Sequence, residues 1–371
     1  MTATPPTQDP GTAHTAADLL PPDPTEPRGQ LPRLAPLIVA VAAVAAASLV
    51  GLILGSGLTM IAVLAWLFFA VVFPTWSVLV ENRRKATDRL VTVLVWTAFV
   101  LAMIPLVSLI VTVVVKGAPA ISWTFLSDDL SGRALIEGTG GIFHAIAGTV
   151  MVTVIAALIA VPIGVLTAVW LVEYGKGTRL ASIITFLVDV MTGIPSIVAG
   201  LFALAFFQVI LNDPLPRLAI GGGVALSLLM IPTVIRSVEE MLKLVPDDLR
   251  EASYALGVPK WRTIVKVVLP TAVAGIVTGV TLAIARVAGE TAPLLLILGT
   301  AYTVNWNPAD GNVATLPTFI YQSLNKTTHF EFGPAWTDMV WGAALVLIVI
   351  VMTLNVAARV IGAAFAPKTG K

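Results

Sequence analysis

The chain has 371 residues, of which 57% are hydrophobic and 12% are charged, and its mean hydropathy is +0.94. A water-soluble fold needs more polar residues to cover its surface, so this composition indicates a polytopic membrane protein. The net charge of +1 argues against a nucleic-acid-binding protein, and the absence of cysteine excludes disulfides, thiol catalysis and thiolate metal sites. No metal site is predicted, because His14, His144 and His329 lie in unrelated segments.

Residues 1–33 are rich in proline, threonine and alanine and show no hydrophobic period. This composition predicts a disordered cytoplasmic tail. A cleavable signal has a basic start that leads directly into an apolar core, whereas Arg28 and Arg33 come only after a long polar run. We therefore expect the first apolar segment to be retained.

Eight apolar stretches are long enough to cross a bilayer core about 30 Å thick, which takes roughly 20 helical residues. They lie near residues 34–54, 58–80, 90–115, 141–172, 180–210, 218–238, 271–299 and 335–361. Kinks or breaks are expected at Pro162, Pro195 and Pro293. The first two spans predict an additional N-terminal hairpin over residues 34–80, followed by a core over residues 90–365.

The distribution of lysine and arginine predicts the orientation, because cationic loops stay in the cytoplasm. If the N-terminus is inside, the external segments hold only Lys116, Arg133, Arg217 and Lys326. Both termini and the charged segment at residues 239–270 are then cytoplasmic. The external loops, 116–140 and 300–334, either contact an extracytoplasmic partner or only connect helices.

The charged segment at residues 239–270 interrupts the apolar spans with two short amphipathic helices. Pro246-Asp247-Asp248 predicts the start of the first helix, with aspartate as an acceptor for its free amides, and Gly257 predicts its end in the left-handed conformation. Leu249, Ala252 and Leu256 share one face of this helix. The polar side chains on its other faces are Arg250, Glu251 and Ser253.

Pro259 predicts the first turn of the second helix, so the two helices meet at a glycine corner. An apolar stripe on the second helix comprises Trp261, Ile264, Val265 and Val268, opposite Lys260, Arg262 and Lys266. An exposed apolar face suits docking into the groove of a partner, with Leu249 and Leu256 as anchors. The alternative is an interfacial segment whose apolar face rests on lipid.

Arg286 and Glu290 are predicted to lie inside the membrane. Arg286 is about 22 Å along the seventh span from Thr271, and Glu290, four residues later, is predicted to share the same helix face. Each such charge costs about 2.5 to 3.5 kcal/mol on insertion scales, which disfavours an incidental placement. The two side chains either line an anion path or form an ion pair that holds helices together.

Two further charges lie within or at the edge of the spans. Arg236, at the end of the sixth span, either faces the inner part of the same path, or extends to the cytosolic interface or pairs with Glu239 and Glu240. Asp189, in the fifth span, is expected to cap the helix that breaks near Pro195 or to pair with a cation.

Three stretches of the sequence carry a family resemblance. Glu251-Ala252-Ser253, then Gly257 four residues later and Val267-x-Leu269-Pro270, has the spacing of the EAA loop of importer permeases. Together with Gly193-Ile194-Pro195-Ser196-Ile197-Val198-Ala199-Gly200 and Arg286-x-x-Gly289-Glu290-Thr291-Ala292-Pro293-Leu294-Leu295, it resembles the A-type permease subunits of phosphate-specific ABC importers. The resemblance covers roughly residues 90–365. Ser253 and Val267 replace the usual alanine and isoleucine, and the first two spans and the tail extend beyond a six-helix core.

The resemblance implies an all-α polytopic membrane protein, a type I importer permease of the MetI-like class with an added N-terminal hairpin. It implies a phosphate path lined by Arg286, Glu290 and Arg236. It also implies a coupling site for a separate ATPase, formed by Leu249, Glu251, Ala252, Ser253, Leu256 and Gly257.

The partners implied are a C-type sister permease, two ATPase subunits and an extracytoplasmic phosphate-binding protein. The sequence has no Gly-x-x-x-x-Gly-Lys-Ser/Thr, so we expect no ATP hydrolysis and no cofactor in this chain. ATP and magnesium would be bound by the partner ATPase.

Two alternatives stay open at this point. Only the stretch at residues 286–295 indicates phosphate, so a permease for sulfate, molybdate or phosphonate is possible on the same resemblance. A secondary transporter would have two related halves, and the charged interruption has no duplicate. An intramembrane enzyme is disfavoured, because no Ser/His/Asp or paired-carboxylate arrangement is evident.

Overall fold

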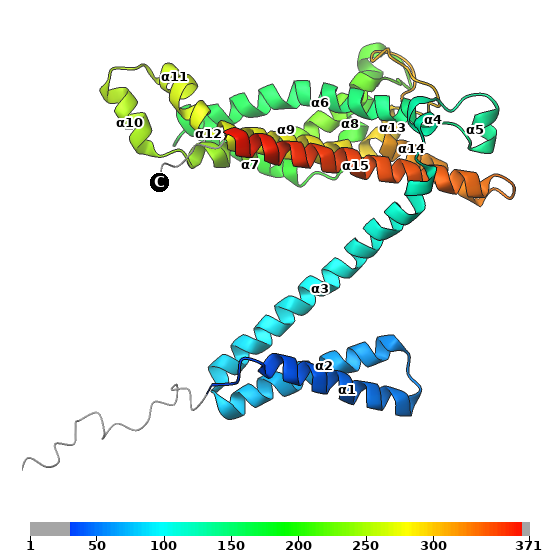
Figure 1. Ribbon diagram of the computed structural model, residues 1–371. Coiled ribbons are helices and arrows are strands. Elements are labelled where there is room, and N and C mark those ends of the chain that lie inside the picture. The colour runs from blue at the N-terminus through cyan, green and yellow to red at the C-terminus, as the bar shows by residue number, and fades with distance from the viewer. Residues whose placement is uncertain (1–29, 366–371) are drawn as a thin grey trace, which may run out of the picture. The chain divides into compact units, whose positions relative to one another are not determined.

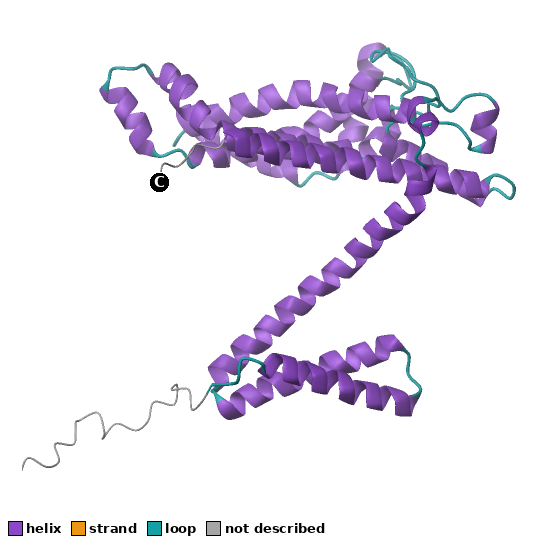
Figure 2. Cartoon of the chain, viewed as in Figure 1, coloured by secondary structure: helices purple, strands orange, loops and turns teal. Residues whose placement is uncertain are grey.

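The computed structural model describes residues 30–365, and the regular structure in that range is entirely helical (Figure 2). Seven helices are long and apolar enough to cross a membrane, and a bent helix pair makes up to eight spans. The predicted all-α polytopic fold is confirmed. The predicted tail lies almost wholly outside the described residues. The chain divides into two compact units, residues 1–109 and 110–371.

The first unit contains α1 (Ala35–Leu54), α2 (Leu58–Val80) and most of α3 (Arg83–Gly117). α1 and α2 pack against each other as a hairpin. Its contact face on α1 is a stripe of small residues four apart, Ala35, Val39, Ala43 and Ala47. Small side chains at this spacing let two helices approach closely within a membrane.

A buried carboxylate organises the turn between α2 and α3. Glu81 accepts hydrogen bonds from Ser77 Oγ (2.8 Å), the Leu31 amide (3.2 Å) and Arg89 Nη2 (3.0 Å), and Lys85 Nζ lies 3.8 Å away. Burial alone would raise the pKa of Glu81. The hydrogen bonds from Ser77 and Leu31, with the charges of Arg89 and Lys85, outweigh burial and lower that pKa.

The second unit is built on four long helices, α6 (Phe143–Val169), α9 (Ala219–Lys243), α12 (Leu269–Ala288) and α15 (Gly333–Phe365). The shorter helices that join them are η2 (Ala118–Ala120), α4 (Trp123–Ser127), α5 (Arg133–Glu137), η3 (Trp170–Tyr174), α7 (Arg179–Thr192), α8 (Ser196–Leu211), α10 (Asp247–Ala255), α11 (Lys260–Thr263), η4 (Ile264–Val268), α13 (Ala292–Ile297), α14 (Leu316–Ser323) and η5 (Leu324–Thr328). Figure 1 shows α10 and α11 at one end of this unit and α4 and α5 at the other.

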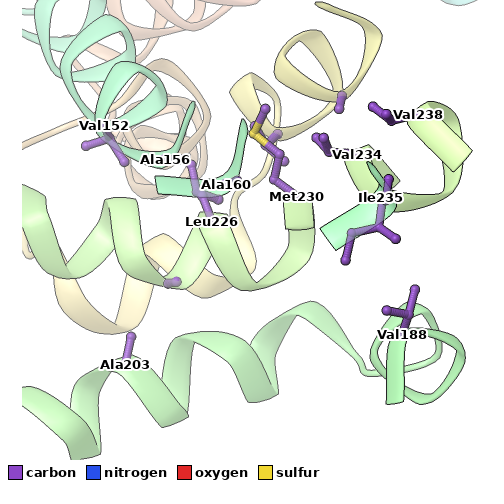
Figure 3. Close-up of a cluster of buried hydrophobic side chains, with 14 of the residues drawn as sticks. Val152, Ala156, Ala160, Val188, Ala203, Leu226, Met230, Val234, Ile235 and Val238 are labelled. Atoms are coloured by element: carbon purple, nitrogen blue, oxygen red, sulfur yellow. The ribbon is translucent and has the colours of Figure 1, made fainter. Parts of the chain in front are cut away.

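The core of the second unit lies between α6 and α9 (Figure 3). α9 contributes Leu226, Met230 and Val234, and α6 contributes Ala156 and Ala160, all of them fully buried. Alanine at this spacing on α6 lets the larger side chains of α9 pack closely against its backbone. α9 is the most enclosed of the long helices. It therefore forms the centre around which the other helices are placed.

Two of the predicted spans are not single helices. The stretch at residues 180–210 forms α7 and α8, which meet at 106° across Gly193–Pro195, so the expected break at Pro195 is confirmed. The stretch at residues 271–299 forms α12 and α13, with a break just before Pro293. α6, in contrast, continues through Pro162 without a break. In membrane helices, neighbouring groups can compensate for the amide that proline lacks.

The two breaks lie close together. α8 packs on α13, and a Cβ on Gly200 would stand 2.6 Å from Pro293 Cα, so only glycine permits this approach. The two sequence stretches that begin at Gly193 and Arg286 thus meet in space beside α9.

Candidate functional site: the coupling loop and the polar pocket

The loop between α9 and α12 has the predicted two helices and the predicted corner. α10 spans Asp247–Ala255, Pro246 precedes it, and Gly257 follows with φ +73° in the left-handed region. A Cβ at Gly257 would meet nothing within 4 Å, so the requirement for glycine is one of backbone conformation. The predicted aspartate cap is absent, because Asp247 Oδ1 accepts a hydrogen bond from Arg250 and α10 has no side-chain cap.

The exposed side of α10 carries both apolar and acidic side chains, with Asp248 and Glu251 among them. Leu256 is 83% exposed, and Leu249 and Tyr254 are also exposed, as are Glu251 and Ala252 between them. The predicted anchors Leu249 and Leu256 therefore face away from the body of the second unit. Exposed leucines beside charged residues are suited to contact with a partner.

The inner face of α10 is polar. Arg250 is only 7% exposed, and its Nε and Nη2 donate to Glu173 Oε1 at 3.1 and 2.9 Å. Ser253 is also buried, and its hydroxyl is 2.8 Å from the hydroxyl of Thr263 in α11. Ser253 therefore holds the two loop helices together and is not on the outer face. The side of α10 that faces the second unit is therefore polar and hydrogen-bonded.

The predicted apolar stripe of the second loop helix is divided between two environments. Ile264 and Val268 are buried in the second unit, whereas Trp261 and Val265 are exposed beside α10. The predicted single stripe is therefore wrong. The chain is helical from Lys260 to Ala288, and residues four apart along it form two separate rows that face in different directions.

The second candidate site is a pocket of about 240 Å³ where the two helix breaks meet α9. Arg286 and Glu290 line it, together with the hydroxyl-bearing residues Thr192, Ser196 and Thr233. α12 ends at Ala288, so Glu290 is not on a shared helix face with Arg286, contrary to the sequence prediction. Within residues 30–365, Arg286 forms no ion pair and its side chain is exposed, so its guanidinium is available to a bound anion.

Arg236 has a different environment from Arg286. It pairs with Asp189 of α7 and with Glu239 (2.9 Å), and Glu239 also binds Lys243 at 2.7 Å. Of the two interpretations drawn from the sequence for Arg236, the structure favours pairing. The expected pairing of Asp189 is confirmed, and this network ties α7 to α9.

Residues 160–371 match the family of binding-protein-dependent transport system inner membrane components. This chain belongs to that family. The phosphate transport system permease protein PstA 1 of Mycobacterium tuberculosis (strain ATCC 25618 / H37Rv) is 47% identical over 283 residues, which are 75% of this chain and 88% of the relative. The proteins named PstA from Mycobacterium leprae (strain TN) and Yersinia pestis are 45% and 36% identical, each over 77% of this chain and over 90% and 95% of their own lengths. The chain is thus a multi-pass membrane permease of the transporter family, and the family match begins inside α6.

Sequence reasoning missed the partnership of Glu173 and Arg250. The two residues are 77 positions apart, so no local pattern relates them. The available signal was a lone carboxylate at the end of the fourth predicted span, which must find a cation or face water.

Proposed function

We propose that this chain is the transmembrane permease subunit of an ATP-driven importer that moves inorganic phosphate into the cell. The observation that carries this proposal is the 47% identity to a protein named as a phosphate transport permease, over nearly its whole length. The free guanidinium of Arg286 in a pocket rich in hydroxyl groups supports it independently, because arginine is suited to bind phosphate oxygens through two parallel hydrogen bonds.

The loop of α10 and α11 is the docking site for a separate ATPase in this proposal. The exposure of Leu249 and Leu256 supports it, since these apolar side chains are displayed to a partner while Arg250 is held against the second unit. Glu251 and Ala252 lie between these anchors, and Gly257 sets the angle between the two helices. Ser253 contributes indirectly through its hydrogen bond to Thr263.

The assembly that follows comprises this chain, a C-type sister permease, two ATPase subunits and an extracytoplasmic phosphate-binding protein. ATP and magnesium are bound by the ATPase, and this chain supplies the path and the coupling surface. Both termini and α10 then face the cytoplasm. The distribution of lysine and arginine in the sequence supports this orientation.

The direction of transport requires an external source of free energy. Moving one negative charge into a cell against an interior-negative potential of 100 mV costs about 2.3 kcal/mol, and a phosphate dianion costs about twice as much. Closure of the ATPase pair supplies this free energy and is transmitted through α10 to the membrane helices. Glu290, in the same pocket as Arg286, would reduce the local positive charge and so prevent the anion from being trapped.

The test is uptake of radiolabelled phosphate into proteoliposomes that contain the whole complex, with Arg286→Gln compared against Arg359→Gln. Arg359 is an exposed arginine of α15 that does not line the pocket. Loss of uptake in the Arg286 variant alone, with the complex intact, is the expected result. Competition by sulfate, molybdate or phosphonate as strong as that by unlabelled phosphate would contradict phosphate as the substrate.

A further inference from the structure

The Arg250 guanidinium joins three separate elements of the second unit. It binds Glu173 in η3, which continues α6, and it donates to the backbone oxygens of Leu242 (3.0 Å) and Val245 (2.7 Å) at the end of α9. The last carbonyl groups of a helix have no partner within that helix, so these hydrogen bonds also complete the C-terminus of α9. One side chain of α10 therefore binds the ends of both α6 and α9.

The end of α6 holds the second loop helix as well. Tyr174 follows Glu173 directly, and its ring lies 4.9 Å from Lys260 Nζ at the start of α11. Glu173 and Tyr174 both belong to η3, which is a π-helical turn. η4, through which α11 leads into α12, is also π-helical. Single π turns of this kind occur frequently at functional sites. Consecutive side chains of η3 thus contact the two helices on either side of the glycine corner.

Stability alone gives a weak reason for a buried ion pair at this position. Glu173 and Arg250 are each 7% exposed, and removing two charges from water costs about as much as their attraction returns. Such a pair does provide a fixed geometry. Two nitrogens of Arg250 donate to the Glu173 carboxylate, and two further hydrogen bonds go to backbone carbonyl oxygens, so together they fix the direction of the arginine side chain. The anchors on the outer face of α10 take no part in these contacts.

We propose that Glu173 and Arg250 are positioning residues that make α10 move as one body with the ends of α6 and α9. This inference rests on the proposed function. The ATPase displaces α10 through its exposed side, and the buried pair on the inner face carries that displacement to the two helices that form the core of the unit. Docking and transmission are then separate properties of the two faces of one short helix.

The separation of the two faces gives a direct test in the assembled complex. Arg250→Gln and Glu173→Gln are compared with Asp247→Asn, a matched control in which Arg250 loses only a partner that is 72% exposed. ATPase retention, ATP hydrolysis and phosphate uptake are measured on the same proteoliposomes. We expect all three variants to retain the ATPase. Phosphate imported per ATP hydrolysed should fall about tenfold in the first two variants, a change within the typical range of coupling effects, and stay near the wild-type value in the control.

An unchanged ratio of phosphate to ATP in both glutamine variants overturns the inference, as does an equal loss in the Asp247 control. If neither glutamine variant assembles, the inference is tested by the distance between two spin labels on a chain that keeps Glu173 and Arg250. Because the chain has no cysteine, thiol labels at Lys176→Cys and Asp248→Cys are specific. A distance between them that stays constant when ATP binds supports the inference, and a change of more than about one helical turn, 5.4 Å, overturns it. If wild-type complexes retain no ATPase, the proposed function fails and this inference fails with it.

Discussion

Truncation of Leu256 is predicted to weaken ATPase binding without weakening the fold. The side chain is 83% exposed, so almost all of its apolar surface is still available to be buried by a partner. Burying a leucine side chain contributes about 1.5 to 3 kcal/mol. If Leu256→Ala forfeits roughly 2 kcal/mol of this, the dissociation constant of the ATPase rises about 30-fold. The stability of the chain itself should change by less than about 0.5 kcal/mol, as for other surface substitutions.

The assay is a titration of labelled ATPase onto the solubilised permease pair, with thermal unfolding measured on the same samples. Leu158→Ala is the matched control, because Leu158 is a 71% exposed leucine of α6 outside the loop. An affinity that is unchanged by Leu256→Ala, or reduced equally by both substitutions, would refute the assignment of the outer face of α10 to ATPase binding.

Three further predictions concern the corner, the α7–α9 network and the first hairpin. Gly257→Ala should reduce phosphate uptake while the ATPase is retained, because alanine in this left-handed conformation costs about 1 to 2 kcal/mol. Gly257→Asn should reduce uptake less, because asparagine adopts this conformation at a lower cost, and uptake measured for both variants checks the prediction. Arg236→Gln breaks the ion pairs with both Asp189 and Glu239, so it should lower the melting temperature of the complex more than Asp189→Asn, and each partly exposed pair contributes at most about 1 kcal/mol. An Asp189→Asn variant that melts at a lower temperature than Arg236→Gln would argue against this network. The pKa of Glu81 is lower in the folded protein than its ordinary value of 4.5, so the contacts of Glu81 stabilise the hairpin at pH values above 4.5, and this stabilisation is lost as the pH falls through the lowered pKa. Hydrogen exchange of the hairpin should show this loss in the wild type and not in Glu81→Gln.

Local signals in the sequence were sufficient for much of the fold. The bounds of α1 and α2 agree with the apolar stretches to within a residue, because hydropathy and length alone determine a membrane helix. The left-handed Gly257 followed from the need to end one helix and begin another across a proline. The break near Pro195 followed from the chemistry of proline, but its angle of 106° depends on how α8 packs against α13 and α9.

The directions of side chains in the candidate sites were harder to predict. Arg250 looks like a surface charge in a helical projection, and only its distant partner Glu173 turns it inward. Ser253 is turned inward by Thr263 in the same way. Glu290 appeared to share a helix with Arg286 because the periodicity of the sequence does not reveal that α12 ends at Ala288. In each case the missing information was a contact between residues on different elements.

The central claim is that a separate ATPase binds the outer face of α10, and a site-specific cross-link tests it most directly. Leu256→Cys provides the only thiol in this chain, and Arg359→Cys provides a thiol at an exposed residue near the end of α15, outside the loop. In membranes that contain the active transporter, a short bifunctional reagent should join the cysteine at position 256 to the ATPase and leave the one at position 359 unjoined. A transporter that imports phosphate normally while position 256 never cross-links to the ATPase would contradict the account.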